Sequence, residues 1–344
     1  MPFIVHARRA CARAARVLTQ YRREYIALSA GNGDHGRLGH GSPDEAHDGW
    51  SPRSSNYFHP VEGVSDLDVR AVAAGGAHSV FLVAGGHVFT CGLNADGQLG
   101  HSAGLPFSPE PMLVRLDVEV VSVAAGNGHT LCVDVDGCVW AFGKNTAGQL
   151  GTGNVDGTIP RKIGALAKEA RVAQVACGAE HSLAVADDGR VYSWGSSTDG
   201  VLGHGSETWN DGWFYRTARA ELAPRLVRSL EDKKVVAVAA GHMHSACIDD
   251  RGNLYTWGQG RFNQLGLSAK PSDHETTPSP VMSLRFVHEI ACGGLHSLAN
   301  TNAGVVSWGA NQHGELGHGH HSDCLLYTSP SPRDRTRSRM PSSA

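Results

Sequence analysis

Gly-Arg-Leu-Gly-His-Gly, at residues 36–41, is the first copy of a phrase that this 344-residue chain carries in six places. The glycine after the leucine falls at positions 39, 100, 151, 203, 266 and 317, so successive copies are 61, 51, 52, 63 and 51 residues apart. Self-similarity at such a period is typical of propellers, solenoids and repeat arrays. The repeat therefore decides the fold class, and it outweighs the two domains that the length alone would suggest.

Composition narrows the class of protein. Hydrophobic residues make up 41% of the chain, enough for a packed interior, and the 43 glycines suit a fold with many tight turns. The net charge of −3 gives no global basic field, so it does not support binding to nucleic acid or chromatin. No apolar run is long enough for a transmembrane segment. The eight cysteines include no Cys-x-x-Cys pair and indicate structural thiols in a reducing compartment.

One repeat illustrates the predicted secondary structure. Residues 235–240 form a short apolar run of small and β-branched residues, and residues 245–248 form a second. Residues 249–252, Asp-Asp-Arg-Gly, are a turn, because Asp and Gly tolerate a positive φ. Residues 254–257 alternate in size as a strand should, and Gln264-Leu265-Gly266 makes a tight corner with a short outer piece. Four short antiparallel strands in about 50 residues are one blade of a β-propeller.

A second phrase occurs five times and ends in His-Ser or His-Thr, as Ala-Ala-Gly-Gly-Ala-His-Ser does at residues 73–79. One active site does not need five copies of a histidine, so we expect these imidazoles to hydrogen-bond within the fold. We expect the leucines of the Leu-Gly phrases to pack between neighbouring blades. The predicted structural residues are His78, His129, His181, His244, His296, Leu99, Leu150, Leu202, Leu265 and Leu316.

Together with Gly189 to Gly195, Gly-Arg-Val-Tyr-Ser-Trp-Gly, these phrases resemble the repeats of the regulator of chromosome condensation family. The resemblance covers residues 26–323 and implies an all-β, seven-bladed propeller closed by strands from both chain ends. Six Leu-Gly phrases but only five His-Ser/Thr phrases occur here. We therefore expect an incomplete propeller of about five full repeats with partial ends, and a monomer if the ring is complete.

The resemblance also implies functions. The founding activity of the family is guanine-nucleotide exchange on a small GTPase, which needs no covalent group from the protein. Other members are scaffolds, ubiquitin-ligase modules or light sensors; the light sensors carry Gly-Trp-Arg-His-Thr phrases that this sequence lacks. We expect a non-catalytic scaffold that binds a protein partner, with regulation of a small GTPase as a finer form. A genuine exchange factor is the alternative, and no cofactor, metal or catalytic residue is predicted.

The two ends differ from the repeats. Residues 1–25 form an Arg-rich segment whose helical wheel is amphipathic, the pattern of an organelle transit peptide. This leaves mitochondrial import open beside a cytoplasmic or nuclear location, and with it a role on organellar nucleic acid or ribosomes. Residues 324–344 are rich in Ser, Pro and Arg, and we expect them to be a disordered or non-native tail.

The two longest repeats contain the candidate interface. Each has an insertion with Asp-Gly-Trp after a Leu-Gly-His-Gly phrase, and insertions in repeat proteins map to loops on a binding face. Aromatic and arginine side chains are common interface anchors, although these rings can instead fold back onto a blade. The candidate binding residues are Trp50, Tyr57, Phe58, Trp209, Trp213, Phe214, Tyr215 and Arg216.

Overall fold

A computed structural model gives the fold of the chain. It describes residues 3–8, 25–41, 54–101, 104–153, 157, 159–205, 220–267, 273–319, 322 and 324–328. The strands form one three-stranded and five four-stranded sheets. The chain divides into two compact units, residues 1–197 with 217–226, and residues 198–216 with 227–344.

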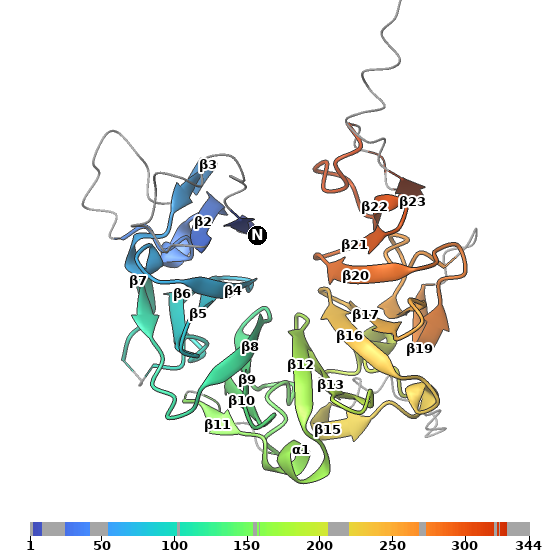
Figure 1. Ribbon diagram of the computed structural model, residues 1–344, viewed down its shortest axis with the longest axis horizontal. Coiled ribbons are helices and arrows are strands. Elements are labelled where there is room, and N and C mark those ends of the chain that lie inside the picture. The colour runs from blue at the N-terminus through green and yellow to red at the C-terminus, as the bar shows by residue number, and fades with distance from the viewer. Residues whose placement is uncertain are drawn as a thin grey trace, which may run out of the picture. The chain divides into compact units, whose positions relative to one another are not determined.

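The first unit contains four of the sheets, each antiparallel and built from consecutive strands (Figure 1). The three-stranded sheet is β1 (Phe3–Arg8), β2 (Tyr25–Asn32) and β3 (Ser54–Pro60). The next blade is β4 (Val69–Ala74), β5 (His78–Val83), β6 (Val88–Leu93) and β7 (Phe107–Leu113). The third sheet is β8 (Val120–Ala125), β9 (His129–Asp134), β10 (Val139–Gly143) and β11 (Arg161–Lys162). The fourth is β12 (Val172–Cys177), β13 (His181–Ala186), β14 (Val191–Gly195) and β15 (Glu221–Leu226).

The second unit contains the other two sheets. One blade is β16 (Val235–Ala240), β17 (His244–Asp249), β18 (Leu254–Gln259) and β19 (His274–Pro280). The other is β20 (Val287–Cys292), β21 (His296–Thr301), β22 (Gly304–Gly309) and β23 (Cys324–Thr328). Short helical turns join the strands: η1 (Asp34–Gly36), η2 (Glu62–Val64), α1 (Gly164–Glu169), η3 (Thr198–Gly200) and η4 (Arg228–Leu230).

The predicted propeller architecture is confirmed. The strands expected at residues 235–240, 245–248 and 254–257 are β16, β17 and β18, with ends that shift by one or two residues. Five complete blades are fewer than the seven of the family type, as the phrase count predicted. Two local expectations differ from the structure. The outer strand β19 begins at His274, after the corner rather than within it, and the six-residue helix α1 was not foreseen.

The degree of burial depends on the position of a strand within its blade. The second strands β5, β9, β13 and β17 are buried along their whole length. In β5, the neighbouring residues Val80 and Phe81 belong to two different core clusters, so both faces of this strand are covered. The first strands carry a β-bulge after their first residue in all five complete blades, as at Val69/Ala71 and Val120/Ser122. A bulge bends the strand and increases its twist, so this recurrence gives every blade the same entry geometry.

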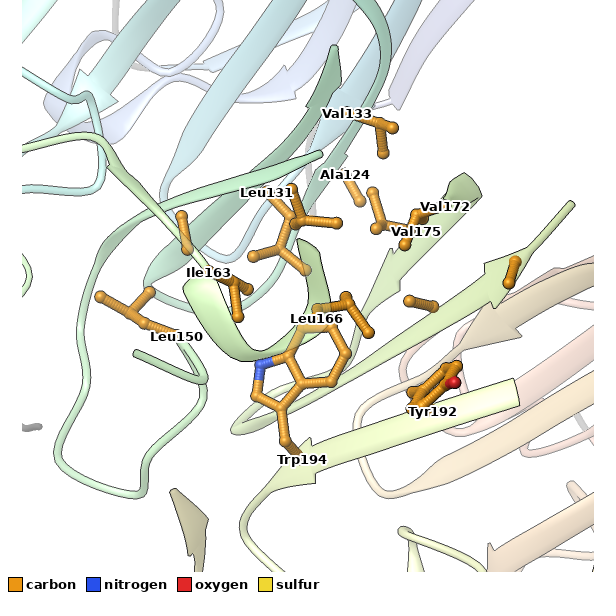
Figure 2. Packing of buried hydrophobic residues seen from close by; sticks show 14 residues of the cluster. Ala124, Leu131, Val133, Leu150, Ile163, Leu166, Val172, Val175, Tyr192 and Trp194 are labelled. Carbon is orange, nitrogen blue, oxygen red and sulfur yellow. The ribbon is translucent and has the colours of Figure 1, made fainter. Parts of the chain in front are cut away.

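The core lies between the sheets. In the first unit, Leu150, Ile163 and Leu166 pack in one cluster with Trp194 and Tyr192 (Figure 2). This explains α1: Leu166 is only 1% exposed, so the short helix serves to cover the cluster. In the second unit, Ala246, Leu254 and Trp308 belong to a corresponding cluster. Packing of each sheet against the next is what a blade requires, since a single sheet cannot bury its own faces.

The two ends of the chain contain strands as well. Phe3–Arg8 forms β1 and pairs with β2, which differs from the helical wheel drawn for this segment. Residues 9–24 lie outside the described residues. Cys324–Thr328 forms β23 and pairs with β22, so the boundary predicted at residue 323 falls just before a fourth strand.

Candidate functional site

Two of the eight candidate binding residues lie in the described part of the chain. Tyr57 and Phe58 are on β3, where 77% and 53% of their surfaces are exposed. Trp50 lies outside the described residues, as do Trp209, Trp213, Phe214, Tyr215 and Arg216. The described part therefore brings Tyr57 and Phe58 together at the surface and does not show these two rings folded back onto a blade.

The Leu-Gly phrase forms a corner whose own side chains hold it closed. In the corner after β6, the Asn94 Oδ1 accepts a hydrogen bond from the Leu99 amide at 3.0 Å, and the Gln98 Oε1 accepts one from the Asp96 amide at 2.9 Å. The same pair of bonds recurs after β10, through Asn145 and Gln149. The Asn and Gln of the phrase thus satisfy turn amides that would otherwise lie unpaired beside a buried leucine.

In several repeats a hydroxyl on the third strand fixes the corner to its own blade, although β10 carries Ala141 at the corresponding position. The Thr90 Oγ1 donates to the Leu99 carbonyl at 2.7 Å, and the Thr256 Oγ1 donates to the Leu265 carbonyl at 2.7 Å. The five predicted leucines are buried, with exposed fractions between 0% and 5%; they are Leu99, Leu150, Leu202, Leu265 and Leu316.

The carbonyl that precedes the leucine fixes the corner to the next blade. The Gln149 carbonyl oxygen accepts two hydrogen bonds, from the Ser182 Oγ at 2.7 Å and from the Trp194 Nε1 at 2.8 Å. In the second unit the Val201 carbonyl accepts from the Ser245 Oγ and the Trp257 Nε1 at 2.8 Å and 2.7 Å. The Gln264 carbonyl accepts from the Ser297 Oγ and the Trp308 Nε1, each at 2.9 Å. Both lone pairs of a buried carbonyl are therefore used at these blade contacts.

The glycine after the leucine lies under the same tryptophan. A Cβ on Gly151 would approach the Trp194 Nε1 to 2.8 Å, and one on Gly266 would approach the Trp308 Nε1 to 2.9 Å. Gly151 and Gly266 also have φ values of 67° and 65°, in the left-handed region. Glycine is thus required twice at this position, once by the backbone and once by the indole.

The recurring histidines extend the same network. The His129 Nε2 lies 3.0 Å from the Ser182 Oγ, and the His78 Nε2 lies 2.9 Å from the Thr130 Oγ1. The His244 Nε2 lies 2.9 Å from the Ser297 Oγ. Because each hydroxyl already donates to a corner carbonyl, it accepts here, and the imidazole carries its proton on Nε2.

Burial keeps these histidines neutral. Desolvation lowers the pKa of His78 to about 4. Desolvation, together with the neighbouring His78, His181 and Lys144, lowers the pKa of His129 to about 3. His181 is buried, and His296 is half-buried with a pKa that burial lowers. A neutral, enclosed imidazole that donates to a hydroxyl suits a structural contact better than proton transfer to a substrate.

Burial also keeps four of the described thiols protonated at neutral pH. Burial raises the pKa of Cys132 and of Cys292 to about 12, and it raises the pKa of Cys91 and Cys247 well above the ordinary value. Thiols protonated at neutral pH are poor nucleophiles and metal ligands. Within the described residues, no His, Cys, Asp and Glu side chains are grouped as a metal site would require. No described helix is long and apolar enough to cross a membrane.

Sequence reasoning missed the aspartate that accepts hydrogen bonds in the turn after β17, and its counterpart Asp134 after β9. The Asp249 carboxylate accepts from the amides of Arg251 and Asn253, at 3.0 Å and 2.8 Å, and from the Asn253 side chain. Partial burial acts to raise the pKa of Asp249, but hydrogen bonds from Asn253 and Arg251 outweigh it and hold the pKa below its ordinary value. Only Gly252 has a positive φ in this turn, so the aspartate is needed as an acceptor rather than for a left-handed backbone. An aspartate two residues before the turn's end was the available signal.

Known proteins are similar to this chain in sequence. The chain is 34% identical to the E3 ubiquitin-protein ligase HERC2 of Homo sapiens over 285 residues, which are 82% of this chain and 6% of HERC2. It is 33% identical to the ultraviolet-B receptor UVR8 of Arabidopsis thaliana over 303 residues, 87% of this chain and 64% of UVR8. The chain therefore spans less than two thirds of the length of either relative.

Solved structures agree on the fold. Human WBSCR16 has a TM-score of 0.73 and 26% identity, over 88% of this chain and 77% of that protein. Yeast RCC1 (Prp20), in its complex with Kap60, has a TM-score of 0.73 and 22% identity, over 90% of this chain and 72% of Prp20. At that identity the likeness to Prp20 concerns the fold alone. The family described as the RCC1-like domain matches residues 26–342. Its repeat phrases, corners and blades all place this chain in that family, and the chain is a member of the RCC1-like domain family.

Proposed function

We propose that this chain is a non-catalytic scaffold whose propeller binds a protein partner. The observation that supports it best is the use of the recurring histidines. His78, His129 and His244 are buried, and each bonds a hydroxyl of the following blade, so the titratable groups that the repeat supplies most often stabilise blades. The buried thiols Cys91, Cys132 and Cys247 have raised pKa values and offer no ready nucleophile either. Recognition by surface side chains is the function that this arrangement leaves best supported.

The proposed interface for that partner is the pair of long insertions. The insertion at residues 206–219 contains Trp209, Trp213, Phe214, Tyr215 and Arg216, and the insertion at residues 42–53 contains Trp50. Trp, Tyr and Arg dominate interface energetics because they combine a large apolar area with a polar group. Because each insertion directly follows a Leu-Gly-His-Gly phrase, we expect it to present these side chains to a folded partner protein.

Relatives support a protein partner and suggest its kind. Solved structures of yeast Prp20 concern its complex with Kap60 and its binding to Gsp1p and histones. In line with the activity that the repeat resemblance implies, the finer proposal is that this chain regulates a small GTPase. HERC2 is named an E3 ubiquitin-protein ligase, but this chain matches only 6% of it, so that activity is not carried over.

Two measurements test the proposal. First, we expect the tagged chain to retain one or more small GTPases or other purified candidate proteins in a binding assay, and Trp213→Ala to weaken that binding about tenfold at an unchanged melting temperature. Phe107→Ala is the matched control, since Phe107 is an aromatic residue that is 42% exposed on β7 and belongs to neither insertion. A large drop in melting temperature for Trp213→Ala would show that the ring packs on the propeller instead.

Second, release of a fluorescent guanine nucleotide from a panel of small GTPases separates binding from exchange. A scaffold leaves the release rate unchanged at saturating concentrations of the chain. Acceleration of release from any member would overturn the non-catalytic assignment and establish exchange activity.

A further inference from the structure

The fourth strands carry a recurring bulge that receives a corner. On β7, Met112 and Ser108 pair with Thr90 and Gly92, so three residues of β7, Pro109 to Pro111, lie opposite one residue of β6. The same three-against-one bulge occurs on β15 at residues 222–224, on β19 at residues 276–278 and on β3 at residues 56–58. We call these four segments the triplets.

Three of the triplets hold the corner of the preceding repeat in the same way. A corner glycine amide donates to the carbonyl of the first triplet residue: Gly41 to Pro109 at 3.2 Å, Gly153 to Leu222 at 3.0 Å, and Gly205 to Thr276 at 2.9 Å. The third residue of each of these triplets is a proline that contacts the glycine after the leucine. A Cβ on Gly39, Gly151 or Gly203 would lie 3.3, 3.2 or 3.1 Å from Pro111, Pro224 or Pro278.

The β3 triplet, Asn56 to Phe58, has the same local structure. The Ser55 Oγ, one residue before the β3 triplet, donates to the carbonyl of the central residue Tyr57 at 2.8 Å. In the same way, the Ser108 Oγ donates to the carbonyl of Glu110, at the centre of the β7 triplet, at 2.7 Å. The burial differs, however. Pro109 and Pro111 are half-buried under their corner, whereas Asn56 and Phe58 are exposed. Within the described part of the first unit, no corner covers the β3 triplet.

A corner of matching sequence is exposed elsewhere in the chain. Residues 314–319 read Gly-Glu-Leu-Gly-His-Gly, the pattern of residues 36–41 and 200–205, both of which occupy triplets. Its glycines have the required backbone, with φ values of 69° at Gly317 and 80° at Gly319. A Cβ on either would meet nothing within 4 Å among the described residues, unlike one on Gly39 or Gly203.

We propose that the β3 triplet of one molecule binds corner 314–319 of a second copy of this chain. By analogy with the three occupied triplets, the Gly319 amide would donate a hydrogen bond to the Asn56 carbonyl, and Phe58 would take the place of the proline beside Gly317. Phe58 would bury much of the surface that it now exposes, because the corresponding proline is half-buried in each occupied triplet, and this supplies the apolar driving force. The contact is heterologous, because the two surfaces differ, so each pair of molecules leaves one triplet and one corner for further association.

Sedimentation velocity on the full chain at increasing concentration tests the self-association. We expect species larger than the monomer, and Phe58→Asp and Gly317→Leu each to weaken association about tenfold or more. Phe107→Asp is the matched control, because Phe107 is an exposed aromatic residue on β7, whose triplet is already occupied. A chain that stays monomeric throughout, or an equal effect of Phe107→Asp, overturns the proposal.

Directed cross-linking identifies the surfaces. A Cβ on Gly41 would lie 3.6 Å from the Glu110 carboxylate, and these residues correspond to Gly319 and Tyr57. Two preparations, Tyr57→Cys and Gly319→Cys, are mixed under mild oxidation, with Phe107→Cys replacing Tyr57→Cys as control. A dimer band specific to the first mixture supports the proposal, and its absence, or an equal band with the control, overturns it. This test uses the chain alone, so it stands or falls independently of the proposed protein partner.

Discussion

Ser182 and Trp194 are direct cross-strand partners on β13 and β14, and both donate a hydrogen bond to one acceptor, the Gln149 carbonyl of the preceding repeat. Ser245 with Trp257, and Ser297 with Trp308, repeat this relationship in the second unit. The His-Ser/Thr phrase, the Trp-Gly phrase and the Leu-Gly phrase therefore meet at a single oxygen atom. Their shared period reflects one contact made repeatedly.

Removing the indole donor should cost a modest amount of stability. Trp194→Phe keeps an aromatic ring over Gly151 but deletes the 2.8 Å bond to Gln149, and we expect the free energy of unfolding to fall by about 1–2 kcal/mol. Tyr192→Phe is the control, because the buried Tyr192 hydroxyl has no hydrogen-bond partner among the described residues. Chemical denaturation measures both variants. Equal losses for the two would contradict the role of the indole nitrogen.

Two glycines in one corner separate backbone strain from packing. Gly151→Ala and Gly153→Ala both place a side chain at a positive φ, of 67° and 78°, which costs each about 1 kcal/mol. Only at Gly151 does the new Cβ meet the Trp194 Nε1 at 2.8 Å, since nothing lies within 4 Å of one on Gly153. We expect Gly151→Ala to lose a further 1–3 kcal/mol, roughly, in thermal or chemical denaturation. Similar melting temperatures for the two variants would refute the contact.

Loss of a recurring histidine should destabilise the blades it joins. His129→Ala removes the bond to Ser182 and leaves a cavity, and we expect a loss of about 2–4 kcal/mol. His87→Ala is the matched control, because His87 is exposed in the turn after β5, where substitution should change stability by about 0.5 kcal/mol or less. Differential scanning calorimetry would show the contrast, and a melting temperature for His129→Ala equal to that of His87→Ala would exclude the structural role.

Stability should begin to decrease as the pH falls below about 6.5, well above the range where carboxylates titrate. An unfolded histidine gains a proton near pH 6.5, whereas folded His78 and His129 resist it down to about pH 4 and 3. Both states are neutral above pH 6.5, so the free energy of unfolding is constant there and decreases as the pH falls, by about 2 kcal/mol per histidine at pH 5. Asp249, with a pKa below 3.8, adds its loss only at more acidic pH.

Urea denaturation at pH 7 and pH 5 measures this slope. The pH dependence should become shallower in His129→Ala, because that variant has lost one of the groups that cause it. If wild type and variant lose the same free energy between the two pH values, burial of His129 is not the source of the effect.

The sequence reveals more of the fold than of the surfaces. Blades, strands and corners follow from the period, and the leucines are read correctly because an apolar side chain recurs in register. The shared acceptor cannot be recognised in this way, because it is the main-chain carbonyl oxygen of residues with unrelated side chains: Arg37, Gln98, Gln149 and Val201. The triplets are equally hidden, because Asn-Tyr-Phe shares its backbone shape with Pro-Glu-Pro and Thr-Thr-Pro but lacks their third-position proline. The six residues of α1 are too few to display a helical period.

The outer strands have a consequence for how the protein behaves at high concentration. Prolines at positions 109, 111, 224, 278 and 280 lie on β7, β15 and β19, the last strand of each sheet. A residue that lacks an amide hydrogen cannot continue a ladder, so these rims resist templating by extended chains. Amyloid-type growth from those blades is thereby discouraged, whereas β3, with proline only at its last residue, and β23, with none, are rims at which a stray strand would add more readily.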